Sequence, residues 1–80
     1  MTHNILRLPE IKRSTGLSRS TIYLRISQGA FTRPVSLGGR AVGWPANEVE
    51  TLNAARIAGK SEVTIRELVA VLEAARKTAK

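Results

Sequence analysis

The hydrophobic positions near the start of the chain are spaced for a short helix. Leu8 and Ile11 stand three residues apart, so both can face the same side. Pro9 suits the first helical turn, where its missing N–H is not needed, and Gly16 suits the left-handed residue that ends a helix. A helix of about two turns does not persist alone in water. We therefore expect it to be held by packing against the rest of the chain.

A second helix is predicted directly after the first. Ser18 is a natural N-cap, and Ile22 and Ile26 stand four residues apart on the expected inner face. Gly29 provides the left-handed stop at the far end. Residues 15–29, which read TGLSRSTIYLRISQG, therefore predict two short helices joined by a tight turn, the helix-turn-helix motif.

After the second helix, the spacing of hydrophobic positions changes from that of a helix to that of a strand. Residues 35–44, VSLGGRAVGW, flank a Gly-Gly pair with strand-like segments, which predicts a two-stranded hairpin with Arg40 beside its tip. If the loop consists of Gly38 and Gly39 alone, the preceding Leu37 pairs with Arg40. A three-residue loop leaves Arg40 freer to extend. The sequence leaves this register open.

A third helix follows the hairpin. It begins at Pro45 and ends at Gly59. Its apolar positions Val49 and Leu52 are expected to face inward.

The last helix has a complete start signal of its own. We expect Thr64 to be its N-cap and Glu67 to complete a capping box with it. Val63 would then pack against Leu68 across the first turn. The apolar face is predicted to consist of Ile65, Leu68, Val69, Leu72 and Ala75.

Together these elements predict a mainly α protein with a small β-hairpin. The order of helix-turn-helix and hairpin is that of a winged helix-turn-helix, which we assign to residues 1–59. Residues 60–80 are expected to form an amphipathic helix. This helix either packs on the domain or mediates self-association.

The composition narrows the functional classes. A chain of 80 residues can bury one small core but has little room for a deep substrate cleft. There is no cysteine, and the one histidine, His3, lies in an expected frayed end, so neither a metal cluster nor a histidine-based triad can be assembled. Residues 36–43, SLGGRAVG, lack the pattern of a phosphate-binding loop. We therefore expect no enzymatic activity, no cofactor and no metal.

Charge points to a polyanionic partner. The net charge is +7, and residues 1–40 hold seven basic groups and one acid, whereas residues 41–80 hold six and five. The positive field thus belongs to the half that contains the helix-turn-helix. Such a surface attracts polyanions, of which nucleic acid is the commonest, although it can also serve solubility alone.

The candidate DNA-binding residues lie at the start and on the exposed half of the second helix, and at the hairpin tip. They are Ser18, Arg19, Ser20, Thr21, Tyr23, Arg25 and Arg40. Ser18 either helps to bind a phosphate or is only a helix cap. Arg19 and Arg25 can each contact a guanine or a phosphate. Tyr23 either hydrogen-bonds a phosphate or packs its ring against the first helix, and Arg40 is either a wing contact or a solvated turn residue.

Three apolar residues have separate expectations. Leu24 falls on the exposed half of the second helix, where it offers a base only apolar contact, for example with a thymine methyl group. Trp44 and Phe31 each border a predicted element, where a small domain needs bulk. We expect both of these rings to be core rather than base-stacking residues.

The segments TGLSRSTIY, PVSLGGRAVGW and EVE resemble the AlpA-type phage regulatory proteins, small winged-helix relatives of the MerR and excisionase groups. The resemblance covers about residues 5–58. It implies a cytoplasmic, nucleoid-associated DNA-binding protein of phage or prophage origin that regulates transcription and thereby promotes excision of an integrated element. It places the turn and recognition helix on residues 15–29 and the wing on residues 35–44. Family members often read Tyr-Arg-Leu-Ile where residues 23–26 read Tyr-Leu-Arg-Ile, which leaves open which face the arginine serves.

Three functional hypotheses follow. The first is a sequence-specific transcriptional regulator that binds double-stranded DNA, as a homodimer or as a cooperative oligomer on adjacent sites. The second is an excisionase-like architectural protein that bends DNA. The third is a protein-interaction adaptor that docks a partner through its last helix. The longest aliphatic stretch, LVAVL, is far below the roughly 20 residues of a membrane span, so we expect a cytoplasmic protein with no membrane or small-molecule partner.

Overall fold

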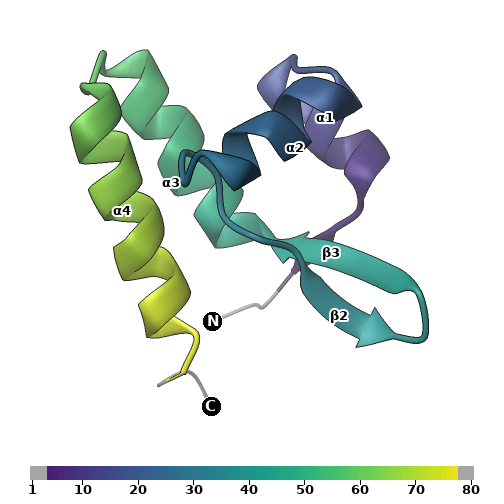
Figure 1. Cartoon of the computed structure of the whole chain (residues 1–80). Coiled ribbons are helices and arrows are strands. Elements are labelled where there is room, and N and C mark those ends of the chain that lie inside the picture. Colours follow the sequence, from purple (N-terminus) through teal and green to yellow (C-terminus); the bar gives the residue numbers. More distant parts are fainter. Residues whose placement is uncertain (1–3, 78–80) are drawn as a thin grey trace.

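The computed structural model describes residues 4–77 and consists of helices and one small sheet (Figure 1). In this range the chain forms four helices and a three-stranded antiparallel sheet with the order β1-β3-β2. In chain order the elements are β1 (Ile5–Leu6), α1 (Leu8–Thr15), α2 (Arg19–Ser27), β2 (Val35–Gly38), β3 (Ala41–Pro45), α3 (Ala46–Ile57) and α4 (Glu62–Ala75). The predicted winged helix-turn-helix is confirmed. His3 lies outside the described residues.

The turn between α1 and α2 follows the sequence signals. Gly16 has a φ of 71°, and its N–H donates to the carbonyl of Lys12 over 2.9 Å. The N–H of Thr21 donates to Ser18 Oγ over 3.2 Å, so Ser18 is the N-cap of α2 as predicted. Three residues between the helices are enough to redirect the chain, because Gly16 adopts the left-handed conformation without strain.

The sheet contains one strand that the sequence pattern did not predict. β1 pairs with β3 through Ile5 opposite Pro45 and Leu6 opposite Trp44, which makes β3 the central strand. Gly43 permits this pairing. A Cβ atom at position 43 would overlap Ile5 Cγ2 and lie 3.0 Å from the carbonyl oxygen of Leu6.

The hairpin has neither of the two registers considered from the sequence. Gly38 lies opposite Ala41, so the two loop residues are Gly39 and Arg40. The register shifts between Ser36 and Gly38, where Leu37 is the extra residue of a bulge. Gly39 has a φ of 55°, which suits the first loop residue of a tight hairpin turn. Arg40 therefore stands in the turn itself rather than at the start of β3.

Trp44 lies at the centre of the core. Its side chain is fully buried, its Nε1–H donates to the carbonyl of Thr32 over 2.9 Å, and its ring lies 6.5 Å from that of Phe31. The prediction that Trp44 and Phe31 are core residues is confirmed. The other buried apolar residues are Ile11, Ile22, Ala30, Val49, Leu52, Ile65 and Val69.

Helix α4 begins earlier than the sequence analysis predicted. Its N-cap is Ser61, whose Oγ accepts the N–H of Thr64 over 3.2 Å, so the assignment of Thr64 as the cap was wrong. Val63 is 63% exposed and does not act as the expected staple. Starting at Ser61 places Glu62 in the first turn, at the positive end of the helix dipole, where it also pairs with Arg56 over 2.8 Å.

The inner face of α4 packs against α3 and shares the core (Figure 1). Ile65 and Val69 are buried, and Leu68 and Leu72 are half-buried against the same cluster. Ala75 is exposed and does not join that face, although the periodicity had placed it there. No helix within residues 4–77 is long and apolar enough to span a membrane.

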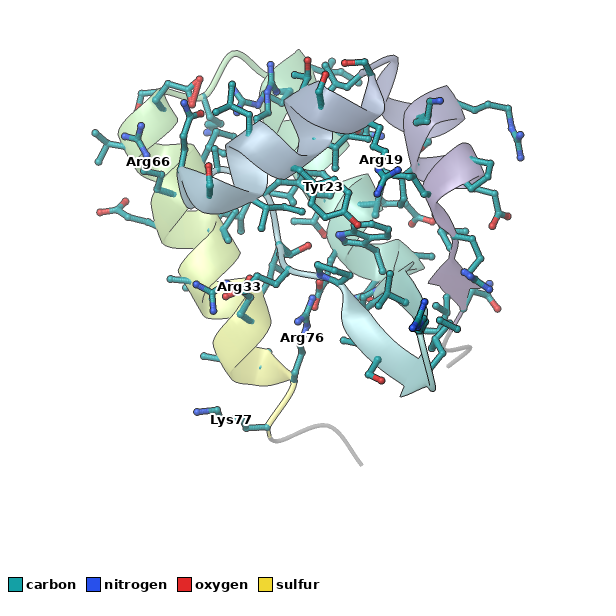
Figure 2. The ribbon with its side chains drawn as sticks, turned by 45° about the vertical axis from the view of Figure 1, so that its right-hand side comes forward. Arg19, Tyr23, Arg33, Arg66, Arg76 and Lys77 are labelled. Atoms are coloured by element: carbon teal, nitrogen blue, oxygen red, sulfur yellow. The ribbon has the colours of Figure 1, made fainter. Side chains whose placement is uncertain are left out.

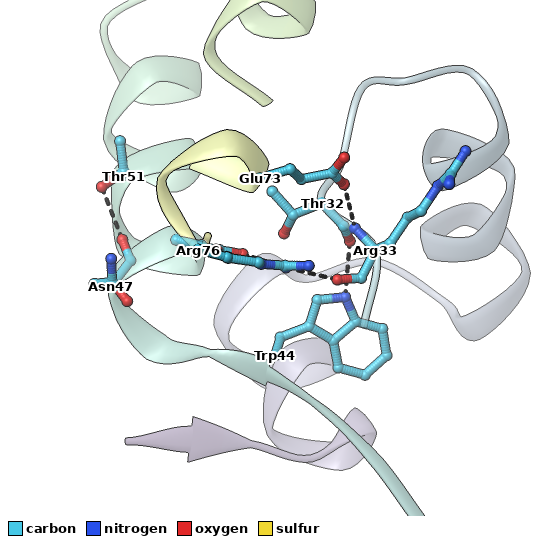
Figure 3. Close-up of polar contacts among 8 residues, drawn as sticks. Thr32, Arg33, Trp44, Asn47, Thr51, Glu73 and Arg76 are labelled. Atoms are coloured by element: carbon cyan, nitrogen blue, oxygen red, sulfur yellow. Dashed lines mark hydrogen bonds and ion pairs between the residues drawn. The ribbon is translucent and has the colours of Figure 1, made fainter. Parts of the chain in front are cut away.

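Polar contacts of Glu73 and Arg76 tie the end of α4 to the rest of the chain, among them those with Arg33 (Figure 3). Arg76 donates from Nε and Nη2 to the two carboxylate oxygens of Glu48 over 2.8 and 2.6 Å. Its Nη2 also donates to the carbonyl of Arg33 over 2.6 Å, while the N–H of Arg33 donates to Glu73 Oε2 over 2.8 Å. Hydrogen bonding of its guanidinium to the Glu48 carboxylate raises the pKa of Arg76 above its already high ordinary value. Both backbone polar groups of Arg33, in the loop between α2 and β2, are thus hydrogen-bonded to side chains at the end of α4.

Glu48→Gln should destabilise the fold by about 3 kcal/mol, because it leaves the guanidinium of Arg76 without its buried carboxylate. Urea unfolding followed by circular dichroism measures the change. Glu50→Gln is the matched control, since Glu50 is an exposed neighbour on the same helix, and we expect it to stay within about 0.5 kcal/mol of the parent chain. Equal effects of the two substitutions would contradict a stabilising role for the pair.

Candidate nucleic-acid interface

One part of the exposed α2 surface carries short side chains except at one position. Ile22 is fully buried on the inner side, whereas Ser20 and Leu24 are exposed, as predicted, and Ser27 is exposed beside them. The hydroxyl of Ser27 donates to the carbonyl of Leu24 over 2.6 Å and is therefore turned back onto its own helix. Leu24, 55% exposed between two small residues, projects from this face.

Arg19 and Tyr23 form a second part of the α2 surface (Figure 2). The guanidinium carbon of Arg19 lies 5.7 Å from the centre of the Tyr23 ring, within range of a cation–π interaction. The Tyr23 ring in turn meets Trp44 edge to face, with 6.3 Å between centroids. Tyr23 thus packs against Trp44 of β3, while 38% of its surface remains exposed.

The first turn of α2 uses its hydroxyl groups internally. Ser18 Oγ accepts from the Thr21 N–H and donates to Thr21 Oγ1 over 2.9 Å, and Ser20 Oγ lies 3.2 Å from Ser18 Oγ. No acidic residue lies in this first turn. The positive end of the α2 dipole is therefore not neutralised by a carboxylate of its own helix, which leaves an electrostatic environment that favours an anion.

Arg25 lies at the boundary between α2 and α4. The hydrogen bond from Arg56 lowers the pKa of Glu62, and the charges of Arg25 and Arg66 lower it further. Arg25 is thus close to the start of α4, and it is half-buried there. The structure does not place it beside Arg19, so these two arginines serve opposite ends of α2.

Arg40 stands at the tip of the hairpin, which extends away from the helices (Figure 1). It is exposed, and within residues 4–77 its guanidinium takes part in neither of the two ion pairs.

Of the seven candidate residues, six lie on α2 or its cap and Arg40 lies on the wing. Arg33 and Arg66 were not among the candidates, and Arg66 comes near the end of α2 only through the fold, where its Nε donates to the carbonyl of Gln28. Residues 4–77 contain no group of His, Asp and Glu side chains that could hold a metal ion.

The helix-turn-helix with its hairpin wing defines a winged helix-turn-helix protein. Residues 4–57 match the family of the prophage CP4-57 regulatory protein AlpA, and the chain belongs to this family of prophage regulatory proteins. It is 53% identical over 55 residues to the uncharacterized protein ORF88 of Enterobacteria phage P4, an alignment that covers 69% of this chain. The chain spans 62% of the length of that relative. No solved structure matches the chain.

Ser18→Ala should lower the free energy of unfolding by about 1 kcal/mol, because the Thr21 N–H loses its cap. Ser18→Asp should restore most of this stability, since aspartate is an equally good cap. Urea unfolding of both variants measures the difference. Ser27→Ala serves as the control at the other end of α2, and a loss there as large as that of Ser18→Ala would argue against a specific cap.

Proposed function

We propose that the chain is a sequence-specific DNA-binding regulator of phage or prophage transcription, acting by binding rather than by catalysis. The observation that carries the proposal is the juxtaposition of α2 with the wing. Tyr23 on α2 packs on Trp44, which belongs to the strand that also forms the wing. The cationic surface of α2 and the arginine at the wing tip are thereby held in one fixed arrangement. Such a regulator would act on the bacterial nucleoid, in the cytoplasm.

In this proposal α2 enters the major groove. A helix with its side chains is about 10–12 Å across, and the groove is about 12 Å wide. Ser20 and Leu24 would face base edges, and the N-terminal turn with Ser18 and Thr21 would approach a phosphate. Arg19 lies between these regions and can reach either a guanine or a phosphate.

The wing would contact the flanking DNA through Arg40. An exposed arginine at the end of a hairpin can bind the backbone or enter the minor groove. Because Arg40 occupies the turn itself, its side chain starts beyond the last paired residues of the sheet. This position favours a flank contact over a contact within the major groove that α2 occupies.

The size of the module implies more than one copy on DNA. A single small DNA-binding module buries about 600–1,000 Å² of protein surface, so useful affinity calls for a dimer or for several adjacent sites. The outer face of α4 carries Val63 and Val71, which are 63% and 64% exposed. A second copy could pack there while leaving the surface of α2 free.

Fluorescence anisotropy tests the proposal. Duplexes tiled across the region upstream of the gene for this chain are compared with scrambled DNA at about 50 and 200 mM salt. We expect one tile to bind far more tightly than scrambled DNA at both salt concentrations. Arg40→Gln should weaken binding to all duplexes and reduce the slope of log K against log salt by about one. Absence of binding even at low salt would refute the proposal and favour a protein-interaction adaptor, whereas equal binding to every duplex would favour an architectural role.

Thymine-to-uracil replacement tests the role of Leu24. Removing the 5-methyl group of a contacted thymine should weaken binding of the parent chain by about 0.8 kcal/mol, roughly fourfold, because one apolar contact is lost. The same replacement should have no effect on the Leu24→Ala variant. Anisotropy titrations with uracil placed at each operator thymine in turn measure this. If no position discriminates between the two proteins, Leu24 does not contact a thymine methyl group.

A further inference from the structure

Cationic side chains of α4, of the turn after it and of the loop after α2 lie near the far end of α2. Arg66 lies in the second turn of α4, and Glu73 follows seven residues later on the same stripe of the helix, whereas Lys77 comes two residues after the helix ends at Ala75. Two contacts show which way the stripe faces. Arg66 Nε donates to the carbonyl of Gln28, at the end of α2, over 3.2 Å, and Glu73 accepts from the N–H of Arg33, in the loop after α2.

Two acidic groups near this stripe make polar contacts of their own, whereas Glu67, beside Arg66, is exposed and joins neither ion pair within residues 4–77. Glu62 pairs with Arg56, and Glu73 binds the backbone of Arg33. The side chains of Arg33, Arg66 and Lys77 are exposed, and none belongs to an ion pair within residues 4–77. Figure 2 shows these three side chains on the same side of the molecule as Arg19 and Tyr23. The charge on this edge is therefore available to a partner.

We propose that Arg33, Arg66 and Lys77 form a flank that binds the phosphates of the DNA strand bordering the groove at the far end of α2. We refer to these three residues as the α4 flank. The proposal rests on the DNA-binding function proposed above and adds a contact from α4, which lies beyond the matched residues 4–57.

Helix dimensions support this assignment. The nine residues of α2 span about 13 Å, close to the width of the major groove, so the end of α2 and the loop after it lie near a phosphate wall. From Arg66 to its end at Ala75, α4 rises about 14 Å, and Lys77 lies beyond that end, so the two cations are far enough apart to contact different phosphates of one strand. A row of cations without base-reading groups adds affinity for any sequence rather than discrimination between sequences.

The test compares two double variants of equal net charge. Arg66→Gln with Lys77→Gln removes two charges from the α4 flank, and Lys12→Gln with Arg13→Gln removes two from exposed positions on α1. Salt titrations of anisotropy with the operator and with scrambled DNA give the slopes. Each lost phosphate contact lowers the slope by about 0.9, so the flank variant should lose about 1.8 and the α1 variant clearly less. Affinity for operator and scrambled DNA should fall together, so that their ratio is unchanged.

Two controls separate failure of the flank from failure of the proposed function. If Arg40→Gln lowers the slope while the two double variants behave alike, DNA binding stands and the α4 flank is overturned. Binding of no duplex by the parent chain overturns both proposals. Because Arg66 also contacts Gln28, urea unfolding checks each variant. Lys77→Gln alone, which removes no side-chain hydrogen bond or ion pair of the described residues, should still lower the slope by about 0.9.

Discussion

Burial of Trp44 on the central strand is the constraint on which the remaining structure depends. β3 pairs with β1 on one side and β2 on the other, while the indole contacts Tyr23 of α2 and the carbonyl of Thr32. One residue therefore fixes the angle between the exposed helix and the wing. In so small a domain, where few apolar side chains are available, a single large ring can set several distances at once.

The Glu48–Arg76 pair supplies a second constraint, from the other end of the chain. It joins the first turn of α3 to the end of α4 and, through the carbonyl of Arg33, to the loop that follows α2. A buried pair of this kind stabilises little relative to apolar packing but is costly to break, so it specifies one arrangement of the loop. The position of α2 thus depends on contacts made about fifty residues later in the chain.

The candidate interface combines features of different origin. Ser18, Ser20 and Leu24 face solvent because of the periodicity of α2 alone. Tyr23 and Arg25 depart from that simple description, since one is held against Trp44 and the other lies near the start of α4. These two contacts hold α2 at its middle and in its last turn, so the helix presents one defined face rather than a choice of rotations.

The sequence by itself determined the helix ends at Gly16 and Ser18, the inward and outward faces of α2 and the presence of a hairpin, because caps and periodicity act within a few residues. Only the tertiary structure decided the pairing of β1 across Gly43, and the bulge that moves Arg40 into the turn. It also decided that Ser61 rather than Thr64 is the N-cap of α4, although both residue types are good caps. It joined Glu48 to Arg76 as well. The physical reason is that each of these outcomes depends on atoms far apart in the chain, whose meeting no local propensity records.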